Sequence, residues 1–220
     1  MKKLKSPKTY KKLHIYLTGF GPYEEIKDNP TEKLVDKIFQ NKSEYETSKT
    51  KIEFSETFEV TVDYINKNFK HIVNSVNQYN KNKNELHLII SYGLFVDGTE
   101  INIETQSTNF INDGNKIKQK IDKNIKEKYI KSLTDVEKIV QIINKENKSN
   151  CSVSNDAGDY LCNYIYYKTI EFCKKNENVI SIFVHIPVLE KINFEKNLSF
   201  FKELINAFEI YYYFLIKVNI

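Results

Sequence analysis

The sequence predicts an α/β fold, a three-layer α/β/α sandwich in which helices cover both faces of a mixed, largely parallel sheet. Short apolar runs typical of strands alternate along the chain with stretches whose apolar residues recur at helical spacing. Such alternation favours parallel strands joined by crossover helices. The 220 residues suffice for one sizeable core, so we expect one α/β domain over residues 13–220 behind a lysine-rich extension over residues 1–12.

The first half of the chain is predicted to run strand, helix, strand, helix. An apolar run over residues 13–17 indicates a buried strand. Residues 30–40 form a helix with proline at its first position and Asn29 as its cap. Alternating apolar residues predict a strand over residues 52–62, and helical spacing predicts a helix over residues 64–79.

The second half continues this alternation. The predicted strands cover residues 86–92, 100–104, 151–153 and 179–186, and the predicted helices cover residues 136–143, 158–173 and 194–212. In sheets of this kind, sites form at the carboxyl ends of the strands, so the motifs at those ends carry the functional information.

The composition is that of a globular protein, with 40% hydrophobic and 28% charged residues. All 33 basic residues are lysines, scattered along the chain, and the net charge is only +4. Without arginine the chain cannot read guanine or phosphate bidentately, so no nucleic-acid partner is expected. A basic nucleic-acid module, suggested by the N-terminal lysines and a pI of about 8.7, is an alternative without a recognised motif.

Three cysteines in apolar surroundings do not suggest a disulfide framework, and a reducing, cytoplasmic location is expected. The lysine-rich start imitates a secretory signal, but its apolar part is short and lacks a small-residue cleavage site. Whether residues 1–12 target the protein stays open. The apolar stretch over residues 211–216 is far below the roughly 20 residues of a membrane span, so no membrane partner is expected.

One cysteine and one histidine stand where strands end. Cys162 follows the turn Ser154-Asn155-Asp156-Ala157-Gly158, which leads from a short strand into a helix, and His185 ends an apolar strand that proline stops. A thiol nucleophile needs a partner that takes and returns a proton near neutral pH, and histidine is the usual one. Cys151 and Cys173 read as core residues, and the other three histidines as structural or exposed.

The loop Thr18-Gly19-Phe20-Gly21-Pro22-Tyr23 invites comparison with a dinucleotide-binding turn. The comparison fails, because a proline interrupts the turn, the third glycine is missing and the next helix starts too late to face a pyrophosphate. The histidines and cysteines also lack metal-ligand spacing. We therefore expect neither a cofactor nor a metal.

Four blocks together resemble the pyroglutamyl peptidase I family of cysteine peptidases, also called pyrrolidone carboxyl peptidases. Residues 17–30 are similar to its Thr-Gly-Phe-(Gly/Glu)-Pro-Phe loop leading to Asn-Pro, and residues 93–109 keep its Gly, Glu, Asn spacing. Residues 154–163 are similar to its Ser-Asn-x-Ala-Gly-x-(Tyr/Phe)-Val-Cys-Asn segment, and residues 183–187 to Phe-Ile-His-Val-Pro. The resemblance implies hydrolysis of the amide bond after an N-terminal pyroglutamyl residue.

Carried over by position, the resemblance implies Cys162 as nucleophile, His185 as general base and acid, and Glu104 as the group that orients the imidazole. Asp156, taken as the cap of the following helix, places Cys162 in its second turn. The helix dipole has largely faded there, so most of the activation of the thiol is assigned to His185.

The resemblance also implies a pocket for the flat, uncharged pyroglutamyl ring. The substrate-binding residues are Phe20 and Tyr23 beside the ring, Asn29 at its lactam, and the backbone of Leu94 and Leu161. Asn29 has the alternative role of a helix cap. Two further alternatives stay open: an inactive family member that acts as a binding protein, and a homo-oligomer in place of a monomer.

Overall fold

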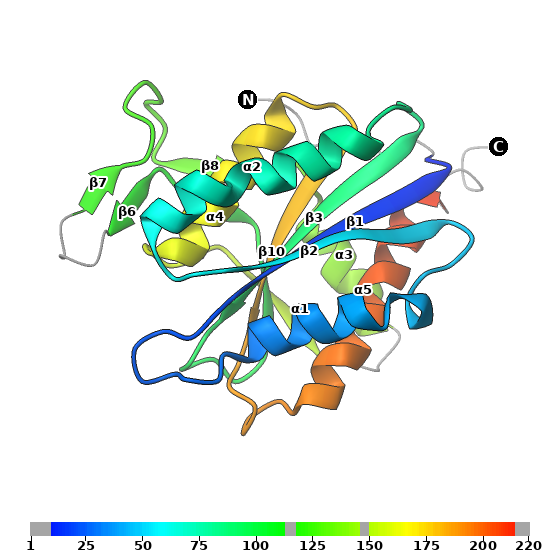
Figure 1. The fold of residues 1–220 in the computed structure, drawn as a ribbon, viewed down its shortest axis with the longest axis horizontal. Coiled ribbons are helices and arrows are strands. Elements are labelled where there is room, and N and C mark those ends of the chain that lie inside the picture. The colour runs from blue at the N-terminus through cyan, green and yellow to red at the C-terminus, as the bar shows by residue number, and fades with distance from the viewer. Residues whose placement is uncertain (1–9, 113–117, 146–149, 214–220) are drawn as a thin grey trace.

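The computed structural model describes residues 10–112, 118–145 and 150–213 and confirms the predicted sandwich around a mixed sheet (Figure 1). Most of the lysine-rich extension, residues 1–9, lies outside the described residues. The central sheet has six strands in the order β2 (Thr50–Phe58), β1 (Lys12–Phe20), β3 (Glu85–Leu94), β10 (Val179–Ile186), β4 (Ile101–Glu104) and β9 (Cys151–Ser154).

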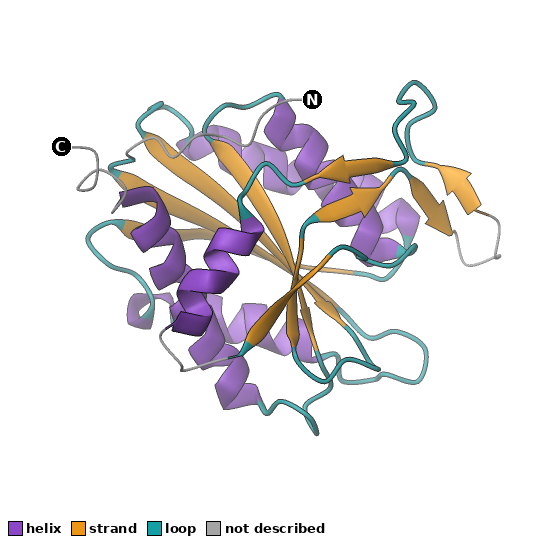
Figure 2. Cartoon of the chain, turned by 180° about the vertical axis from the view of Figure 1, so that it is seen from behind, coloured by secondary structure: helices purple, strands orange, loops and turns teal. Residues whose placement is uncertain are grey.

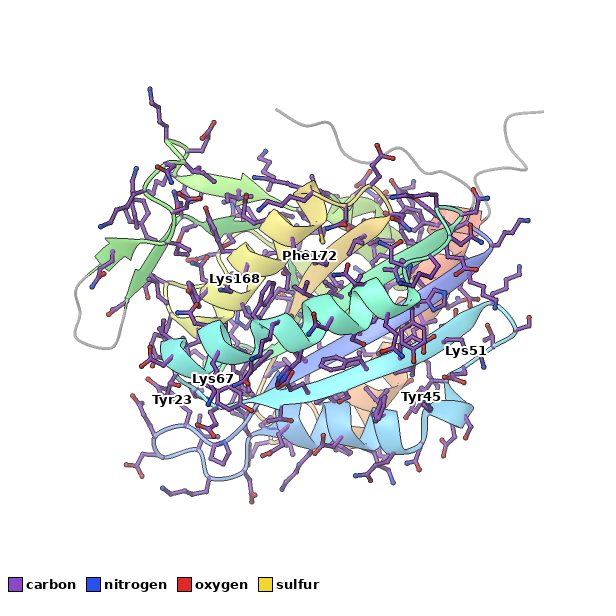
Figure 3. All side chains as sticks on the ribbon, turned by 45° about the horizontal axis from the view of Figure 1, so that its top comes forward. Tyr23, Tyr45, Lys51, Lys67, Lys168 and Phe172 are labelled. Atoms are coloured by element: carbon purple, nitrogen blue, oxygen red, sulfur yellow. The ribbon has the colours of Figure 1, made fainter. Side chains whose placement is uncertain are left out.

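The helices form one layer on each face of the sheet, and Figures 1 and 2 show the molecule from opposite sides. One layer contains α1 (Pro30–Gln40), α3 (Val136–Lys145) and α5 (Phe194–Tyr213), and the other contains α2 (Val62–Tyr79) and α4 (Leu161–Lys174). Each layer packs its apolar face on the sheet, which gives two hydrophobic clusters, one on each side of the strands. Lys168 of α4 bridges to α2, where its ammonium lies 5.0 Å from the centre of the Phe69 ring (Figure 3).

Strand direction changes once across the sheet. The strands β2, β1, β3 and β10 run parallel, whereas β4 runs antiparallel to β10 and β9 runs parallel to β4. The pairing of His185 with Asn102 and of Val184 with Ile103 sets β4 beside the carboxyl end of β10. This reversed strand brings a second set of side chains to the edge where β1, β3 and β10 end.

An arm of short strands, absent from the predicted elements, projects beside α4 (Figure 1). The strand β5 (Gln106–Thr108) pairs with β8 (Tyr129–Lys131), and β6 (Phe110–Asn112) pairs with β7 (Lys118–Lys120). Buried Asn109 fixes the arm, because its carboxamide donates to the carbonyls of Asp122 and Ile125 and accepts from the Asp122 N–H. Three-residue strands with polar sequences give too short a pattern to recognise.

The first strand was predicted too short, since β1 continues through Thr18 and Gly19 to Phe20. Two other elements were predicted too long, and in both a turn extends into the predicted element. The strand over residues 52–62 ends at Phe58, and α2 begins at Val62 behind Thr61, whose hydroxyl accepts from the Tyr64 N–H at 3.1 Å. The helix predicted from Gly158 begins at Leu161, because Gly158 has φ +78°, a conformation that no helix continues. A short 3₁₀ helix, Lys42–Glu44, also follows α1.

The three histidines outside the candidate site, His14, His71 and His87, are structural or exposed, as predicted. His87 is buried, lies 2.9 Å from the Tyr16 hydroxyl and stacks on His14, and burial lowers its pKa to about 3. His14 lies between Glu53 and Glu85. Over the described ranges, no helix combines the length and the apolar content needed to cross a membrane.

Candidate active site

All eight residues predicted for the site line one cleft of about 730 Å³ at the edge where β1, β3 and β10 end. Three of its lining residues come from strand ends: Phe20 ends β1, Leu94 ends β3, and His185 lies one residue before the end of β10. Glu104 comes from the reversed strand β4, and Leu161 and Cys162 open α4. The fold therefore gathers residues far apart in sequence into one place.

A short hydrogen bond joins His185 to Glu104. The Nδ1 atom of His185 lies 2.7 Å from Oε1 of Glu104, and the two residues are 7% and 1% exposed. A carboxylate accepts here, so Nδ1 carries a hydrogen and Nε2 is left for the thiol. The Tyr166 hydroxyl donates to the carbonyl of Glu104 at 2.7 Å and fixes the backbone behind the carboxylate.

Two opposing effects, burial and the neighbouring groups, set the pKa of His185. Burial disfavours the imidazolium, but hydrogen bonds to Cys162 and Glu104 and the charges of both favour it more strongly, and together they raise the pKa of His185 to about 9. At neutral pH the ring therefore carries a proton on each nitrogen. A protonated imidazole between a sulfur and a carboxylate stabilises the thiolate, the reactive form of cysteine.

Cys162 lies in the first turn of α4, which corrects the prediction that placed it in the second turn. Tyr160 is the N-cap and Leu161 the first helical residue, so Asp156 does not cap the helix. Instead, Asp156 accepts from the Gly158 N–H at 3.0 Å in the preceding turn. Within the described part of the chain no side chain caps α4, so its first N–H groups and the positive end of its dipole are free to act on the sulfur.

Gly93 lets Cys162 approach the sheet closely. A Cβ atom at Gly93 would lie 2.8 Å from the Cys162 sulfur and 2.6 Å from the Phe183 ring. The Phe183 ring packs on the His185 ring with 4.8 Å between centres. The sequence offered Gly93 only as part of a motif, and nothing in it identified Phe183 as the support of the imidazole.

Asn163 fixes the start of α4 to the arm. Its Oδ1 accepts from the Ser107 hydroxyl and the Thr108 N–H, both at 2.7 Å, and its Nδ2 donates to the carbonyls of Thr108 and Phe110. All these bonds are buried or partly buried, so they hold the residue after Cys162 in one position. Sequence reasoning missed this role, because it depends on an arm that was not predicted.

The other predicted residues form the opposite side of the cleft. Phe20 is buried at the end of β1. Tyr23 lies on the loop between β1 and α1 (Figure 3), and its ring centre is 5.7 Å from that of Tyr160. A hydrogen bond to Glu24, together with burial, raises the pKa of Tyr23 to about 12. Tyr23 therefore presents a neutral aromatic ring to the cleft.

Asn29 caps α1, as one of its two predicted roles requires. Its Oδ1 accepts from the Thr31 N–H at 3.0 Å and from the Thr31 hydroxyl at 2.9 Å. Its Nδ2 donates to the Gly21 carbonyl at 3.0 Å, which ties the loop after β1 to the helix. The carboxamide nitrogen has two hydrogens, and Asn29 also lines the cleft.

Among the described residues, no group of three or more His, Cys, Asp or Glu side chains is placed to hold a metal ion. The groups that can act in the cleft are a thiol, an imidazole, a carboxylate and the N–H groups that open α4. This set suits nucleophilic attack on a carbonyl followed by proton transfer to a leaving group.

The fold and this group of side chains define a class, the cysteine peptidases. A family model described as pyroglutamyl peptidase matches residues 13–202. The chain belongs to the pyroglutamyl peptidase family, which confirms the resemblance noted in its motifs.

Relatives agree with this assignment, and a solved structure shares the fold. A pyrrolidone-carboxylate peptidase of Oceanobacillus iheyensis is 31% identical over 206 residues, which cover 89% of this chain and 96% of that protein. One from Brachyspira hyodysenteriae is 27% identical over 176 residues, covering 79% and 82%. The solved pyrrolidone carboxyl peptidase from Thermococcus litoralis shares the fold, with a TM-score of 0.72 and 21% identity over 88% of this chain and 92% of that one.

Replacing Gly93 by alanine should slow the alkylation of Cys162 by iodoacetamide at pH 7. The new methyl group displaces the sulfur from His185, and a cysteine with an ordinary pKa of about 8.5 is only a few per cent ionised at that pH, so the rate should fall by about tenfold or more. Alkylation is measured by mass spectrometry of the Cys162 peptide. Gly21→Ala is the matched control, because a Cβ there meets its nearest atoms at 3.7 Å. Wild-type reactivity in a folded Gly93→Ala protein would refute the close-approach argument.

Proposed function

We propose that the protein is a cysteine exopeptidase that hydrolyses the amide bond after an N-terminal pyroglutamyl residue. The observation that carries this proposal is the buried bond of 2.7 Å between His185 and Glu104 in the cleft that Cys162 lines. Membership of the pyroglutamyl peptidase family supports the choice of substrate. A binding protein has no need for this cluster, so catalysis is favoured over the inactive alternative.

In the proposed mechanism, the Cys162 thiolate attacks the carbonyl carbon of the pyroglutamyl residue. The carbonyl oxygen becomes an oxyanion, and the backbone N–H groups at the start of α4 donate to it. His185 then gives its Nε2 proton to the leaving amine, the C–N bond breaks, and a thioester remains on Cys162. Water, deprotonated by His185, attacks the thioester and releases pyroglutamate, which restores the starting state.

Three features share the activation of the thiol in this proposal. His185 supplies the positive charge beside the sulfur, Glu104 holds the ring and balances its charge, and the first turn of α4 adds its dipole. The dipole contribution exceeds what the sequence suggested, since Cys162 lies one turn closer to the helix start than predicted.

The pyroglutamyl ring is small, flat and uncharged, and the wall built from the loop after β1 suits it. We assign its faces to Phe20 and Tyr23, and its lactam to the second Nδ2 hydrogen of Asn29. The backbone of Leu94 and Leu161 borders the same space and completes the contacts with the substrate. A site that pairs with the lactam rejects proline, which has the ring but no lactam carbonyl.

A reducing environment suits a thiol nucleophile, and we place the protein in the cytoplasm. The two other free cysteines, Cys151 and Cys173, are buried, and burial raises the pKa of Cys151 to about 12, so both are suited to a structural role. Pyroglutamyl peptides are the partner class that the cleft supports. Assembly into a homo-oligomer stays a prediction, as does the absence of nucleic-acid and membrane partners.

Purified protein should release the fluorophore from a pyroglutamyl fluorogenic amide in the presence of a thiol reductant, and Cys162→Ala should abolish this release because it removes the attacking sulfur. Fluorescence assays and thermal melts of both proteins check the expectation. Cys151→Ala is the matched control and should stay active. Activity in Cys162→Ala would overturn the assignment of the nucleophile, and an inactive but folded wild type would overturn the proposed function.

The pH profile of kcat/KM should have an alkaline limb near pH 9. The pKa of His185 is raised, so the imidazolium persists through neutral pH and is lost as the pH rises through about 9, which removes the proton donor and the thiolate's partner. Glu104→Gln removes a charge that raises this pKa, so the limb should move to lower pH and the rate should fall by ~10² or more, less than in His185→Ala.

Glu100→Gln is the control for this comparison, because Glu100 is an exposed carboxylate just before β4, the strand that ends with Glu104. Its profile should match the wild type. An unshifted alkaline limb with full activity in Glu104→Gln would show that Glu104 does not act on the imidazole.

Replacing Asn29 by alanine should lower both stability and specificity. Loss of the cap costs about 1 kcal/mol of the free energy of unfolding. Loss of the lactam contact should narrow the preference for pyroglutamyl over prolyl amides, which sites of this kind hold at ~10⁴ or more. Thr61→Ala removes the cap of α2, outside the cleft, and should lower stability alone. If Asn29→Ala behaves in the same way, Asn29 is only a cap.

A further inference from the structure

Two large apolar side chains are exposed at the mouth of the cleft. Phe95 is 42% exposed and Val96 is 48% exposed, and both line the space that contains Cys162. Single exposed apolar residues are common on protein surfaces, and Tyr129 and Val153 are further examples in the described part of the chain. Phe95 and Val96 differ from these two because they are adjacent in the chain and both line the cleft with Cys162 and His185.

The segment that carries them is held in place by its backbone. The Phe95 N–H donates to the Ile186 carbonyl at 2.8 Å, which attaches the segment to the end of β10. The Gly98 N–H donates back to the Phe95 carbonyl at 3.0 Å, and the Lys191 ammonium donates to the Val96 carbonyl at 3.1 Å. The aromatic ring also packs closely on Gly98, where a Cβ atom would lie 2.6 Å from it. Phe95 is therefore a preformed surface.

Phe95 lies on the leaving-group side of the chemistry. Its ring centre is 5.9 Å from that of His185. In the proposed mechanism the leaving nitrogen takes its proton from His185, so the residue that carries this nitrogen must pass beside that ring. The side chains of Phe20 and Tyr23, which we assign to the pyroglutamyl ring, come from a different segment, and Leu94, the neighbour of Phe95, is assigned to the substrate through its backbone alone. The cleft, at about 730 Å³, has the size of pockets for drug-sized ligands and exceeds the need of one five-membered ring.

We propose that Phe95 and Val96 form the subsite for an apolar side chain on the residue that follows the scissile bond. This inference rests on the proposed hydrolysis of pyroglutamyl amides and extends it to the choice of leaving group. An apolar side chain that covers Phe95 and Val96 removes exposed apolar surface on both sides. Because the surface is fixed before the substrate binds, little ordering opposes the contact.

The test compares two substrates, pyroglutamyl-phenylalanine amide and pyroglutamyl-alanine amide. Both are carboxamides, since Glu24, Glu25, Asp156 and Asp159 line the cleft and would repel a free carboxylate. The wild type should prefer the phenylalanine substrate by about tenfold in kcat/KM. Phe95→Ala should bring the ratio close to one, whereas Phe95→Leu and Val96→Ala should each keep part of it.

Tyr129→Ala is the matched control, because Tyr129 is an aromatic residue of similar exposure that lies outside this cleft, and it should leave the ratio unchanged. Equal rates for the two substrates in the wild type would overturn the inference and leave the proposed function intact. An equal loss for both substrates in Phe95→Ala and Phe95→Leu, with normal melts, would also overturn it, since Phe95 would then only position His185. A folded wild type that hydrolyses neither substrate would overturn the proposed function itself.

Discussion

The site depends on the hydrogen bond between His185 and Glu104. Oε2 of this buried carboxylate has no hydrogen-bond partner among the residues described, so the stabilising contact of the side chain goes through Oε1 to the imidazole. A buried carboxylate is costly to keep charged unless a partner compensates it. The carboxylate therefore favours a protonated His185, and a protonated His185 favours a charged sulfur at Cys162. The contact between Glu104 and His185 thus supports the protonated imidazole on which the proposed attack depends.

The reversed strand β4 makes this contact geometrically possible. In a wholly parallel sheet the strand beside β10 would end at the same edge as β10. Because β4 runs the other way, its last residue, Glu104, lies under the imidazole and near the middle of the sheet. The chain then crosses to the arm, whose contacts with Asn163 fix the start of α4 and so the position of Cys162. The reversal and the arm together place the sulfur opposite the carboxylate.

The sequence predicted the layers and the strands of the central sheet, and the eight residues that it proposed for the site line one cleft, because long apolar periods and short motifs are local signals. It did not predict the start of α4, which depends on the positive φ of Gly158, nor the arm, whose strands have three residues each. It also missed Phe183, Asn163 and the spatial role of Gly93. Gly93 and Asn163 act through contacts between segments far apart in the chain, and a single sequence contains no record of such contacts, whereas Phe183 packs on His185 two residues further along the same strand.

The two walls of the cleft come from separate parts of the fold, and this separation bears on how specificity is set. In the proposal, the side chains of the acyl wall come from the loop between β1 and α1, held by Asn29, whereas Leu94 and Leu161 add only backbone contacts. In the proposal, the wall beside the leaving group is the segment after β3, which the Phe95 N–H joins to the end of β10. His185 belongs to β10 and Cys162 to α4, so the reacting groups lie between the two walls and belong to neither. In the proposal, side chains on the two walls set which substrate is taken, and the bond between His185 and Glu104 supports the chemistry between them.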